Sequence, residues 1–456
     1  MERKWRALLI VCVAIFMLLL DITVVNVALP SIQRDLHTSF TDLQWVVDAY
    51  ALLLATSVLN AGTLGDWLGR KRIFMGGVAL FTLASALCGS ATTPLFLNLA
   101  RGLQGIGGAV MFAVSLAILS QEFHGRERGT AFGIWGATIG LAVAIGPLAG
   151  GVLTEYAGWR WIFFVNVPIG IACIFGSIRY LHESRDEHHR GFDLWGFAFL
   201  TAGLFALVLA LLRGESWGWS SGRTIGLFVA SAVLLPAFVV AQLRQDQPML
   251  DVRLFRKPTF TGAQAIAFTI SSGMFAQFLY LTLYLQNGLK LSPLQTGLRF
   301  LPLSLLSFVV APIAGRLSSR VPVRLIFAAG MSLVGASLLL MHGVTHSSSW
   351  TTLLPGFIVG GIGIGLVNAP LAVTAVGVVE PRRAGMASGT NNTFRQVGLA
   401  TGVAALGAIY QGYRDPIDGL NAILLVGAVV AFAGALLGLA LVRREDFVRA
   451  PQPDAA

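Results

Sequence analysis

The segment from Ala14 to Pro30, AIFMLLLDITVVNVALP, is apolar and long enough to cross a bilayer, yet Asp21 lies near its middle. A carboxylate in hydrocarbon costs about 2.5–3.5 kcal/mol on insertion scales. Such an acid normally faces the interior of a helix bundle or a wet cavity, and it marks an ion or proton pathway. The segment therefore predicts a membrane protein whose first helix is packed inside a bundle, with proton chemistry at Asp21.

The composition extends this prediction to the whole chain of 456 residues. Hydrophobic residues make up 55% and charged residues 12%, and the mean hydropathy is +0.74. Soluble domains are about 25% charged, so the solvent for much of this chain must be lipid. The three cysteines lie singly in apolar segments, which predicts no disulfide framework and no metal site. A nucleotide-binding G-x-x-x-x-G-K-[ST] motif and a nucleophile–base pattern are both missing, so we expect no cofactor, no ATP-driven transport and no enzyme.

A hydropathy window of about 19 residues predicts an all-α integral membrane protein. Its fourteen expected transmembrane helices cover residues 7–29, 45–63, 73–92, 95–119, 129–153, 161–180, 194–212, 224–242, 259–285, 294–314, 325–343, 352–377, 386–410 and 420–442. These helices leave no room for a soluble domain.

The basic residues indicate how the helices are oriented. Of the 32 lysines and arginines, 23 fall on one side of the predicted membrane, 6 on the other and 3 within spans. The positive-inside rule then places both termini in the cytoplasm, and the arginine-rich composition favours a bacterial inner membrane. The net charge of +10 is explained by topology, so nucleic-acid binding is not expected. The six basic residues on the outer side are Arg34, Arg160, Arg213, Arg223, Lys290 and Arg414.

Two pairs of segments reveal an internal repeat. The first match pairs GRERGTAFG, ending at Gly133, with PRRAGMASG, ending at Gly389. A second, weaker match pairs GTLGDWLGRKR from Gly62 with GRLSSRVPVR from Gly315. Repeats of this kind are typical of transporters built from two halves. The predicted domains are a six-helix bundle at 1–185, two inserted helices at 186–250, a second six-helix bundle at 251–443 and a short cytoplasmic tail at 444–456.

The loop after the second predicted helix carries the most specific motif. Its glycines allow a tight turn, Asp66 can lie at the N-terminus of a neighbouring helix, and Arg70 can pair with an acid such as Glu122. The loop resembles that of the major facilitator superfamily, G-x-L-A-D-R-x-G-R-K, and departs from it at Gly65 and Trp67. The resemblance implies a latch on the inner gate, and the alternative is an ordinary charged turn. The matching residues are Gly62, Leu64, Asp66, Gly69, Arg70 and Lys71.

Arg101 lies about six residues inside the fourth predicted helix, at roughly the depth of Asp21. A nearby cation stabilises the charged carboxylate whereas burial destabilises it. Asp21 can therefore gain or lose a proton as its surroundings change. The family resemblance extends to R-x-x-Q-G at Arg101, Gln104 and Gly105, and it implies a role for the arginine in proton transfer. A purely structural ion pair is the alternative.

The fifth predicted helix reads GATIGLAVAIGPLAGG and presents a face of small residues for close helix packing. Within the superfamily this pattern resembles the antiporter motif of exporters, which favours export over uptake. Generic glycine packing is the alternative. The motif residues are Gly140, Gly146, Pro147, Gly150 and Gly151.

Further segments narrow the resemblance. DITVVNVALP and WVVDAYALLLA are similar to the fourteen-helix drug:proton antiporters, in particular the methylenomycin-resistance type, and the likeness covers essentially the whole chain. Asp48, near the outer side of the second helix, is either a second titrating group or a carboxylate that lines a wet mouth. Eight residues are predicted for a substrate cavity: Asn26, Gln104, Met111, Trp135, Phe275, Tyr280, Asn368 and Asn391.

These features together predict a secondary active transporter with the major facilitator fold. We expect it to act as a monomer in the lipid bilayer and to export drugs or other small amphipathic molecules in exchange for protons, by alternating access. The first alternative is a proton-coupled facilitator for an endogenous metabolite, in export or uptake. A second alternative is a membrane sensor that transports nothing.

Overall fold

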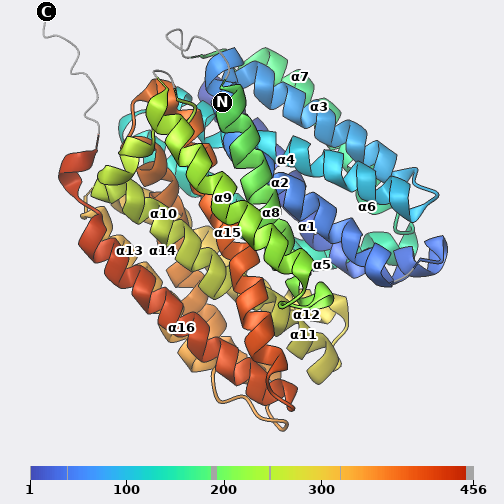
Figure 1. The fold of residues 1–456 in the computed structure, drawn as a ribbon. Coiled ribbons are helices and arrows are strands. Elements are labelled where there is room, and N and C mark those ends of the chain that lie inside the picture. The colour runs from blue at the N-terminus through green and yellow to red at the C-terminus, as the bar shows by residue number, and fades with distance from the viewer. Residues whose placement is uncertain (1, 39, 186–192, 246–247, 319, 448–456) are drawn as a thin grey trace, which may run out of the picture.

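The computed structural model describes residues 2–38, 40–185, 193–245, 248–318 and 320–447. All regular secondary structure in these ranges is helical, and long helices run alongside one another in a bundle (Figure 1). The first half of the chain contains α1 (Arg3–Leu36), α2 (Phe40–Leu68), α3 (Arg70–Gly89), α4 (Pro94–Glu122), α5 (Gly125–Tyr156), α6 (Trp161–Phe164) and α7 (Asn166–Tyr180).

Two inserted helices follow, α8 (Leu194–Trp217) and α9 (Gly222–Arg244). The second half contains α10 (Pro258–Ile270), α11 (Gln277–Leu283), α12 (Pro293–Leu317), α13 (Val323–Met341), α14 (Leu354–Gly377), α15 (Ala384–Gln411) and α16 (Pro416–Leu441). Two π-helical turns, Ser271–Phe275 and Tyr284–Gly288, join α10 and α11 into one continuous passage. Short 3₁₀ turns cover Val252–Arg256, Trp350–Leu353, Pro381–Arg383 and Arg444–Asp446.

Twelve helical segments of the described chain are long and apolar enough to cross a membrane. They include α6 and α7 taken together and the α10–α11 passage taken as one. The all-helical membrane fold predicted from the sequence is therefore confirmed, whereas the count of fourteen spans is not. The other two predicted spans are α5 and α15, which are 32 and 28 residues long and pack among the twelve.

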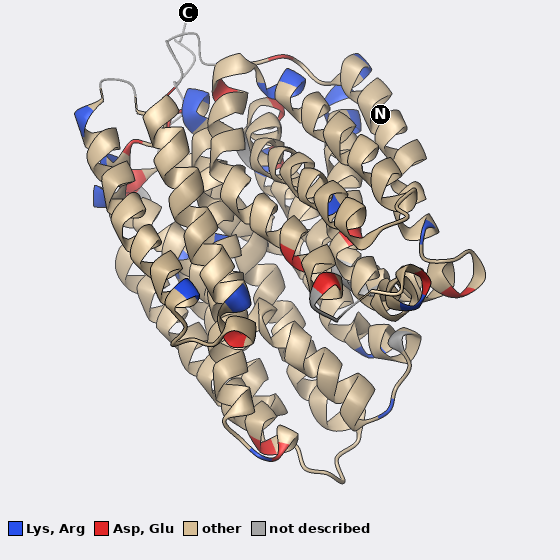
Figure 2. Cartoon of the chain, turned by 45° about the vertical axis from the view of Figure 1, so that its right-hand side comes forward, with Lys and Arg blue, Asp and Glu red and all other residues tan. Residues whose placement is uncertain are grey.

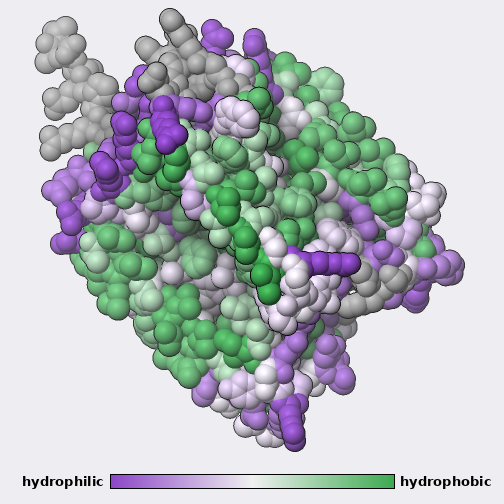
Figure 3. Space-filling view, in the orientation of Figure 1, coloured by the Kyte–Doolittle hydropathy of each residue, from purple (hydrophilic) through white to green (hydrophobic). Residues whose placement is uncertain are grey.

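The exterior fits a lipid environment. Large apolar side chains are exposed along the outer helices, among them Leu83, Val233 and Leu436 at 61–67% exposure. Figure 3 shows apolar surface over much of the molecule, with hydrophilic residues gathered toward its ends. Charged residues likewise lie mainly toward the ends of the helices (Figure 2). Inside, one large apolar core lies mainly in the first half and includes a few residues of α14 and α15, and a second lies within the second half.

We call the side where α1 begins and α16 ends the terminal face, and the side where α1 ends and α16 begins the distal face (Figure 1). At the terminal face the two halves meet through pairs of glycines. A Cβ atom added to Gly62 of α2 would collide with the backbone of Gly385 on α15, and one added to Gly129 of α5 would collide with Gly315 on α12. Only glycine permits helix backbones to approach this closely.

The internal repeat relates these two contacts to each other. Gly62 corresponds to Gly315, and Gly129 corresponds to Gly385, so the contact of α2 with α15 has its equivalent in the contact of α5 with α12. One turn further along, Gly133 packs on Pro312 and its counterpart Gly389 packs on Leu59. The terminal face is thus closed by two symmetry-related helix crossings.

A substitution on α5 tests this closure. Gly129→Val places a branched side chain where the Gly315 backbone lies, whereas Gly151→Val on the same helix enters open space and serves as the control. We expect Gly129→Val to separate α5 from α12 at the terminal face. Electron paramagnetic resonance distances between spin labels on Glu127 and Arg320 should lengthen in this variant. Unchanged distances would contradict the closed crossing.

Candidate functional site

An ion pair lies inside the first half, between Asp21 of α1 and Arg101 of α4. The Asp21 Oδ2 atom is 2.5 Å from Arg101 Nη1, and the two side chains are 0% and 1% exposed. Two charges so buried persist only when each satisfies the other and the remaining polar atoms find hydrogen bonds. The surroundings of the pair therefore decide what it can do.

Three further polar side chains surround the carboxylate. Gln104 of α4 donates from Nε2 to Asp21 Oδ1 at 2.9 Å and to Ser85 Oγ of α3 at 2.7 Å. Its own Oε1 accepts from Arg101 Nη1 at 2.6 Å. Asn166, at the start of α7, donates to Asp21 Oδ1 at 3.1 Å. These hydrogen bonds satisfy the carboxylate oxygens of Asp21 and join α1 to α4 and α7.

A further helix, α2, holds Arg101 in place. Its Nε donates to the Val46 carbonyl of α2 at 2.9 Å, and its guanidinium lies 4.3 Å from the centre of the Tyr50 ring. Protonation of Asp21 would remove the counter-charge of an arginine that touches α2 and α4, and would disturb contacts to α1, α3 and α7. The network thus joins five helices of the first half through one ion pair.

A second ion pair joins the first half to the inserted helices. Arg213 of α8 is 1% exposed, and its Nε lies 3.1 Å from Asp48 Oδ2 of α2. Its Nη1 donates to Gln44 Oε1 at 3.1 Å, and its guanidinium lies 4.2 Å from the centre of the Trp45 ring. The sequence placed Arg213 in an outer loop, which is wrong, because α8 continues for more than a turn beyond the predicted end at residue 212.

The loop motif lies at the terminal face, where α2 meets α15. Asp66 accepts hydrogen bonds from the backbone N–H groups of Gly385 at 3.0 Å and Met386 at 2.7 Å, in the first turn of α15. A carboxylate at this position satisfies otherwise unpaired N–H groups and interacts favourably with the helix dipole. Asp66 therefore links the end of α2 in one half to the start of α15 in the other.

Arg70 strengthens the same contact. It donates to Asp66 Oδ1 at 2.8 Å and to the carbonyls of Pro381 and Arg382 at 2.7 and 3.0 Å. The suggested partner Glu122 is incorrect, since the Glu122 carboxylate lies 2.9 Å from His182 Nδ1. Gly62 lies one turn before Asp66, against Gly385.

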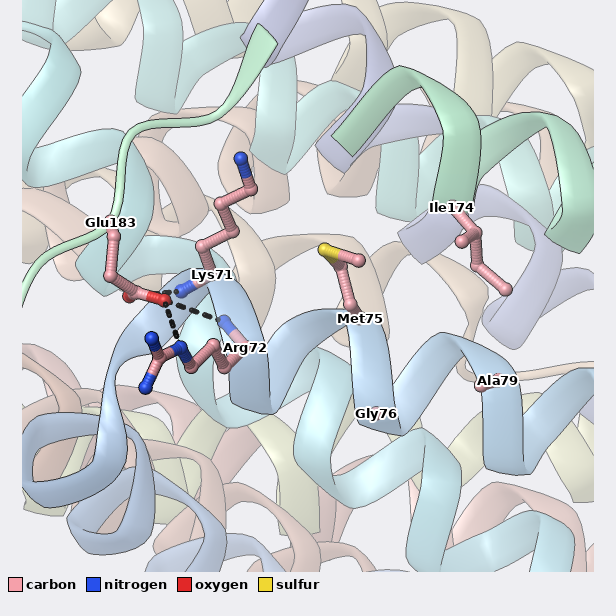
Figure 4. Close-up of a pocket in the computed structure, with 7 residues that line it drawn as sticks. All are labelled: Lys71, Arg72, Met75, Gly76, Ala79, Ile174 and Glu183. Carbon is pink, nitrogen blue, oxygen red and sulfur yellow. Dashed lines mark hydrogen bonds and ion pairs between the residues drawn. The ribbon is translucent and has the colours of Figure 1, made fainter. Parts of the chain in front are cut away.

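The remaining motif residues shape the turn from α2 into α3. Gly69 has a φ of +113°, a conformation that favours glycine, and an added Cβ would meet the Glu183 carboxylate. Glu183 accepts hydrogen bonds from the backbone N–H groups of Lys71 and Arg72 (Figure 4). The groove beside them, of about 610 Å³, lies between α3 and α7 of the first half. It is therefore separate from the crossing of the two halves.

The antiporter motif on α5 touches two different partners. Gly140 faces α12, where a Cβ would lie 3.5 Å from Ser307 Oγ. Gly146 and Gly150 face α1 instead, at Thr23 and Val24, two and three residues beyond Asp21. An added Cβ at Gly151 would meet nothing within 4 Å. The side chain of Pro147 lies outside the part of the chain that the structure describes.

The eight residues predicted for a substrate cavity lie in separate surroundings. Gln104 belongs to the Asp21 network, and Met111 is part of the core of the first half. Tyr280 donates to the Val403 carbonyl at 2.7 Å, and Asn391 donates to Gln264 Oε1 at 3.1 Å, both within the second half. Gln104, Tyr280 and Asn391 thus each have a hydrogen-bond partner within their own half.

The other four predicted residues are placed differently. Asn26 is exposed on α1, and Phe275 stacks on Phe278 with ring centres 6.0 Å apart. Trp135 donates to Ser115 Oγ at 3.2 Å. Asn368 of α14 accepts a hydrogen bond from Arg395 of α15 and lies against Gly136 of α5. Asn368 therefore lies at a contact of α14 with α5 of the other half.

Three of the residues in these networks were not singled out from the sequence. Ser85 and Asn166 look like ordinary polar residues of the third and sixth spans. Only the fold brings Asn166 to Asp21, and Ser85 to the amides of Asn166 and Gln104. Arg213 could have been found by allowing the seventh span to extend beyond residue 212, since the apolar pattern continues up to it. A basic residue directly after a predicted span can belong to the helix, and assigning it to a loop conceals this.

The chain matches a known family model over most of its length. The model of the Major Facilitator Superfamily matches residues 11–403 and 265–456. Multidrug resistance protein Stp of Mycobacterium tuberculosis is 38% identical over 396 residues, covering 87% of this chain and 74% of that protein. Methylenomycin A resistance protein of Streptomyces coelicolor is 31% identical over 432 residues, covering 94% and 90%.

A third relative is the tetracenomycin C resistance and export protein of Streptomyces glaucescens, which is 33% identical and covers 89% of this chain and 76% of that protein. Among solved structures, the human organic anion transporter MFSD10 superposes with a TM-score of 0.71 over 96% of this chain and all of that chain. At 15% identity this likeness concerns the fold alone.

The energetics of the Asp21 network can be measured directly. Asp21→Ala leaves the Arg101 charge buried without its partner, which should lower the free energy of unfolding by about 3–5 kcal/mol. The further change Arg101→Met should restore much of that loss, because no unpaired charge remains. Thermal unfolding of the purified variants measures both effects. Asp35→Ala, which removes a 46%-exposed partner of Arg160, should cost less than about 1 kcal/mol.

Proposed function

This chain belongs to the Major Facilitator Superfamily, and from that premise we propose that it exports drug-like small molecules in exchange for protons. It is a membrane transporter and not an enzyme, and its relatives include drug-resistance proteins. The observation that carries proton coupling is the Asp21–Arg101 pair, a titratable acid held in a transmembrane helix beside a permanent cation. Loss of the Asp21 charge would leave the buried Arg101 without its partner, so a change of protonation would act on the protein around the pair.

The closed terminal face supplies the second element of the mechanism. We assign this face to the cytoplasm of a bacterial inner membrane, from the excess of basic residues in the loops there. The conformation described is then one in which the path to the cytoplasm is shut, by the glycine crossings and by Asp66 on α15. Rocking of the two halves would open this face and close the other.

Proton entry is proposed from the distal side. Asp48 is 18% exposed and lies eight residues from the distal start of α2, whereas Asp21 is fully buried. Asp48 is therefore the more accessible of the two acids and is placed to receive a proton first. Protonation of Asp21 would then loosen the network on Arg101 and promote the rearrangement that delivers the proton to the cytoplasm.

The driving force is adequate for useful export. One elementary charge that crosses a potential of 100 mV supplies about 2.3 kcal/mol, to which the pH gradient adds. A single proton can thus sustain more than a tenfold accumulation ratio, since about 1.4 kcal/mol corresponds to tenfold.

A second candidate function is the export or uptake of an endogenous metabolite by the same fold. Growth of an efflux-deficient host on a panel of dyes and antibiotics separates the two, because only a drug exporter protects against several unrelated compounds. A non-transporting sensor would show no flux of any compound in proteoliposomes.

The central test is Asp21→Asn, which keeps a polar group of the same size but cannot carry the charge. We expect the variant to reach the membrane and to lose proton-driven efflux, because its protonation state no longer changes. Everted vesicles give the readout, as proton release on addition of substrate.

Asp35→Asn is the matched control, since Asp35 lies on the same helix but is 46% exposed and outside the Asp21 network. It should retain efflux. Undiminished substrate-induced proton release from Asp21→Asn would overturn the assignment of the coupling residue.

A further inference from the structure

Arg395 of α15 is a buried cation without a buried anion. It is 8% exposed, and its Nη2 donates to Asn368 Oδ1 of α14 at 2.9 Å. Among the described residues, no carboxylate forms an ion pair with it, and Asn368 is its hydrogen-bond partner. A neutral amide oxygen does not balance a full positive charge in a low-dielectric interior.

The contrast with the other buried arginines makes this position exceptional. Four arginine side chains in the described chain are almost fully buried, and three of them face an acid. The three pairs are Arg70 with Asp66, Arg101 with Asp21, and Arg213 with Asp48. The protein thus supplies an internal carboxylate at every such place except Arg395. Charged groups within membrane spans that lack a partner in the protein are typical of substrate or ion pathways.

Arg395 also lies where the two halves meet. Asn392 is three residues earlier on α15, hence on the same helix face, and it donates to the Phe112 carbonyl of α4 in the other half at 3.4 Å. Its Oδ1 is buried without a hydrogen-bond partner among the described residues. Asn368, which holds Arg395, lies against Gly136 of α5. Two helices of the opposite half therefore border this part of α14 and α15.

An aromatic pair lies on the other side of this junction. Phe112 of α4 and Trp135 of α5 are stacked, with ring centres 5.8 Å apart and planes inclined by 19°. Trp135 directly precedes Gly136, and Phe112 is the residue whose carbonyl Asn392 reaches. When the halves separate, Arg395 and Asn392 would part from the helix segments that carry this aromatic pair. That combination suits an organic anion with an aromatic body.

We propose that Arg395 binds the carboxylate, or an equivalent anionic group, of an aromatic molecule that the protein transports. This inference rests on the proposed export function and specifies its substrate class. The guanidinium offers a planar fork of donors that matches a carboxylate. Asn392 supplies a further amide, and Phe112 with Trp135 supplies the apolar wall. The anion would provide the counter-charge that the protein lacks at this position.

Matched pairs of ligands test the proposal. The purified full-length protein in nanodiscs is titrated with five aromatic carboxylic acids, among them 1-pyrenebutyrate, and with the methyl ester of each. We expect wild-type protein to bind acids more tightly than their esters. Arg395→Gln should reduce acid affinity by about tenfold or more and leave ester affinity nearly unchanged, because only the charged hydrogen bonds are lost.

Two further variants keep the result interpretable. Arg395→Lys retains the charge without the fork, so its preference for acids should fall between those of wild type and Arg395→Gln. Arg299→Gln, on α12, is the control and should behave as wild type, since Arg299 lies 4.7 Å from the ring of Trp350, in the 3₁₀ turn that precedes α14. Thermal unfolding shows whether each variant is folded.

The outcomes separate this inference from the export function. Equal affinity of wild-type protein for acids and esters would overturn the role of Arg395, and so would a loss of affinity in Arg395→Gln that affects both equally. If proton-driven efflux of dyes persists in either case, the export function stands and only the role of Arg395 in binding anions is rejected. If acids bind through Arg395 but no proton-coupled flux is found, the binding site stands and the export mechanism fails.

Discussion

A pair of opposite charges in the interior of the first half constrains much of this structure. Asp21 and Arg101 are stable there because a carbonyl of α2 accepts from Arg101, while amides of α4 and α7 donate to Asp21. Ser85 of α3 accepts from both of these amides and so holds them in place. Removing either charge leaves the other in a low-dielectric interior, so the neutral and charged forms of Asp21 require different surroundings. The antiporter motif packs directly beside this network, since Gly146 and Gly150 lie against Thr23 and Val24 on α1. A change at Asp21 can therefore affect α5, the helix that contacts α12 of the other half at Gly129.

The repeat in the sequence explains how that crossing is built. Gly129 and Gly385 occupy equivalent positions, and so do Gly62 and Gly315, which makes the two contacts at the terminal face symmetric. The symmetry is incomplete in charge. The first repeat has Asp66 four residues after its glycine, where it accepts the N–H groups of α15, whereas the second repeat has Ser319 at the corresponding place. At the α2–α15 crossing a carboxylate binds the start of α15, whereas at the α5–α12 crossing Arg316 donates to Thr130 Oγ1 at 3.2 Å.

The sequence predicted well what depends on local composition and on depth in the membrane. The apolar runs located the helices, and the similar depths of Asp21 and Arg101 allowed their contact. Prediction was weaker where a side chain finds its partner across the bundle. Gln104 resembles a cavity residue by polarity, but its position three residues after Arg101 directs it to the same carboxylate. Arg213 was assigned to a loop because a charged residue lowers the hydropathy of its window. The helix nevertheless continues past Arg213 and its side chain is buried.

The first of the inserted helices also has a structural role. Helix α8 packs against α2 and α15, the two helices of the crossing that also carries Asp66. Near the distal face Arg213 faces Asp48 of α2, and Glu215 accepts a hydrogen bond from Gln411 of α15. Nearer the middle, Thr201 Oγ1 accepts from Asn60 of α2 at 2.7 Å. Because α2 and α15 belong to different halves, any motion that parts them must also move α8 or break these contacts. Helix α8 therefore reinforces the α2–α15 side of the interface between the halves, where Asp66 binds the start of α15.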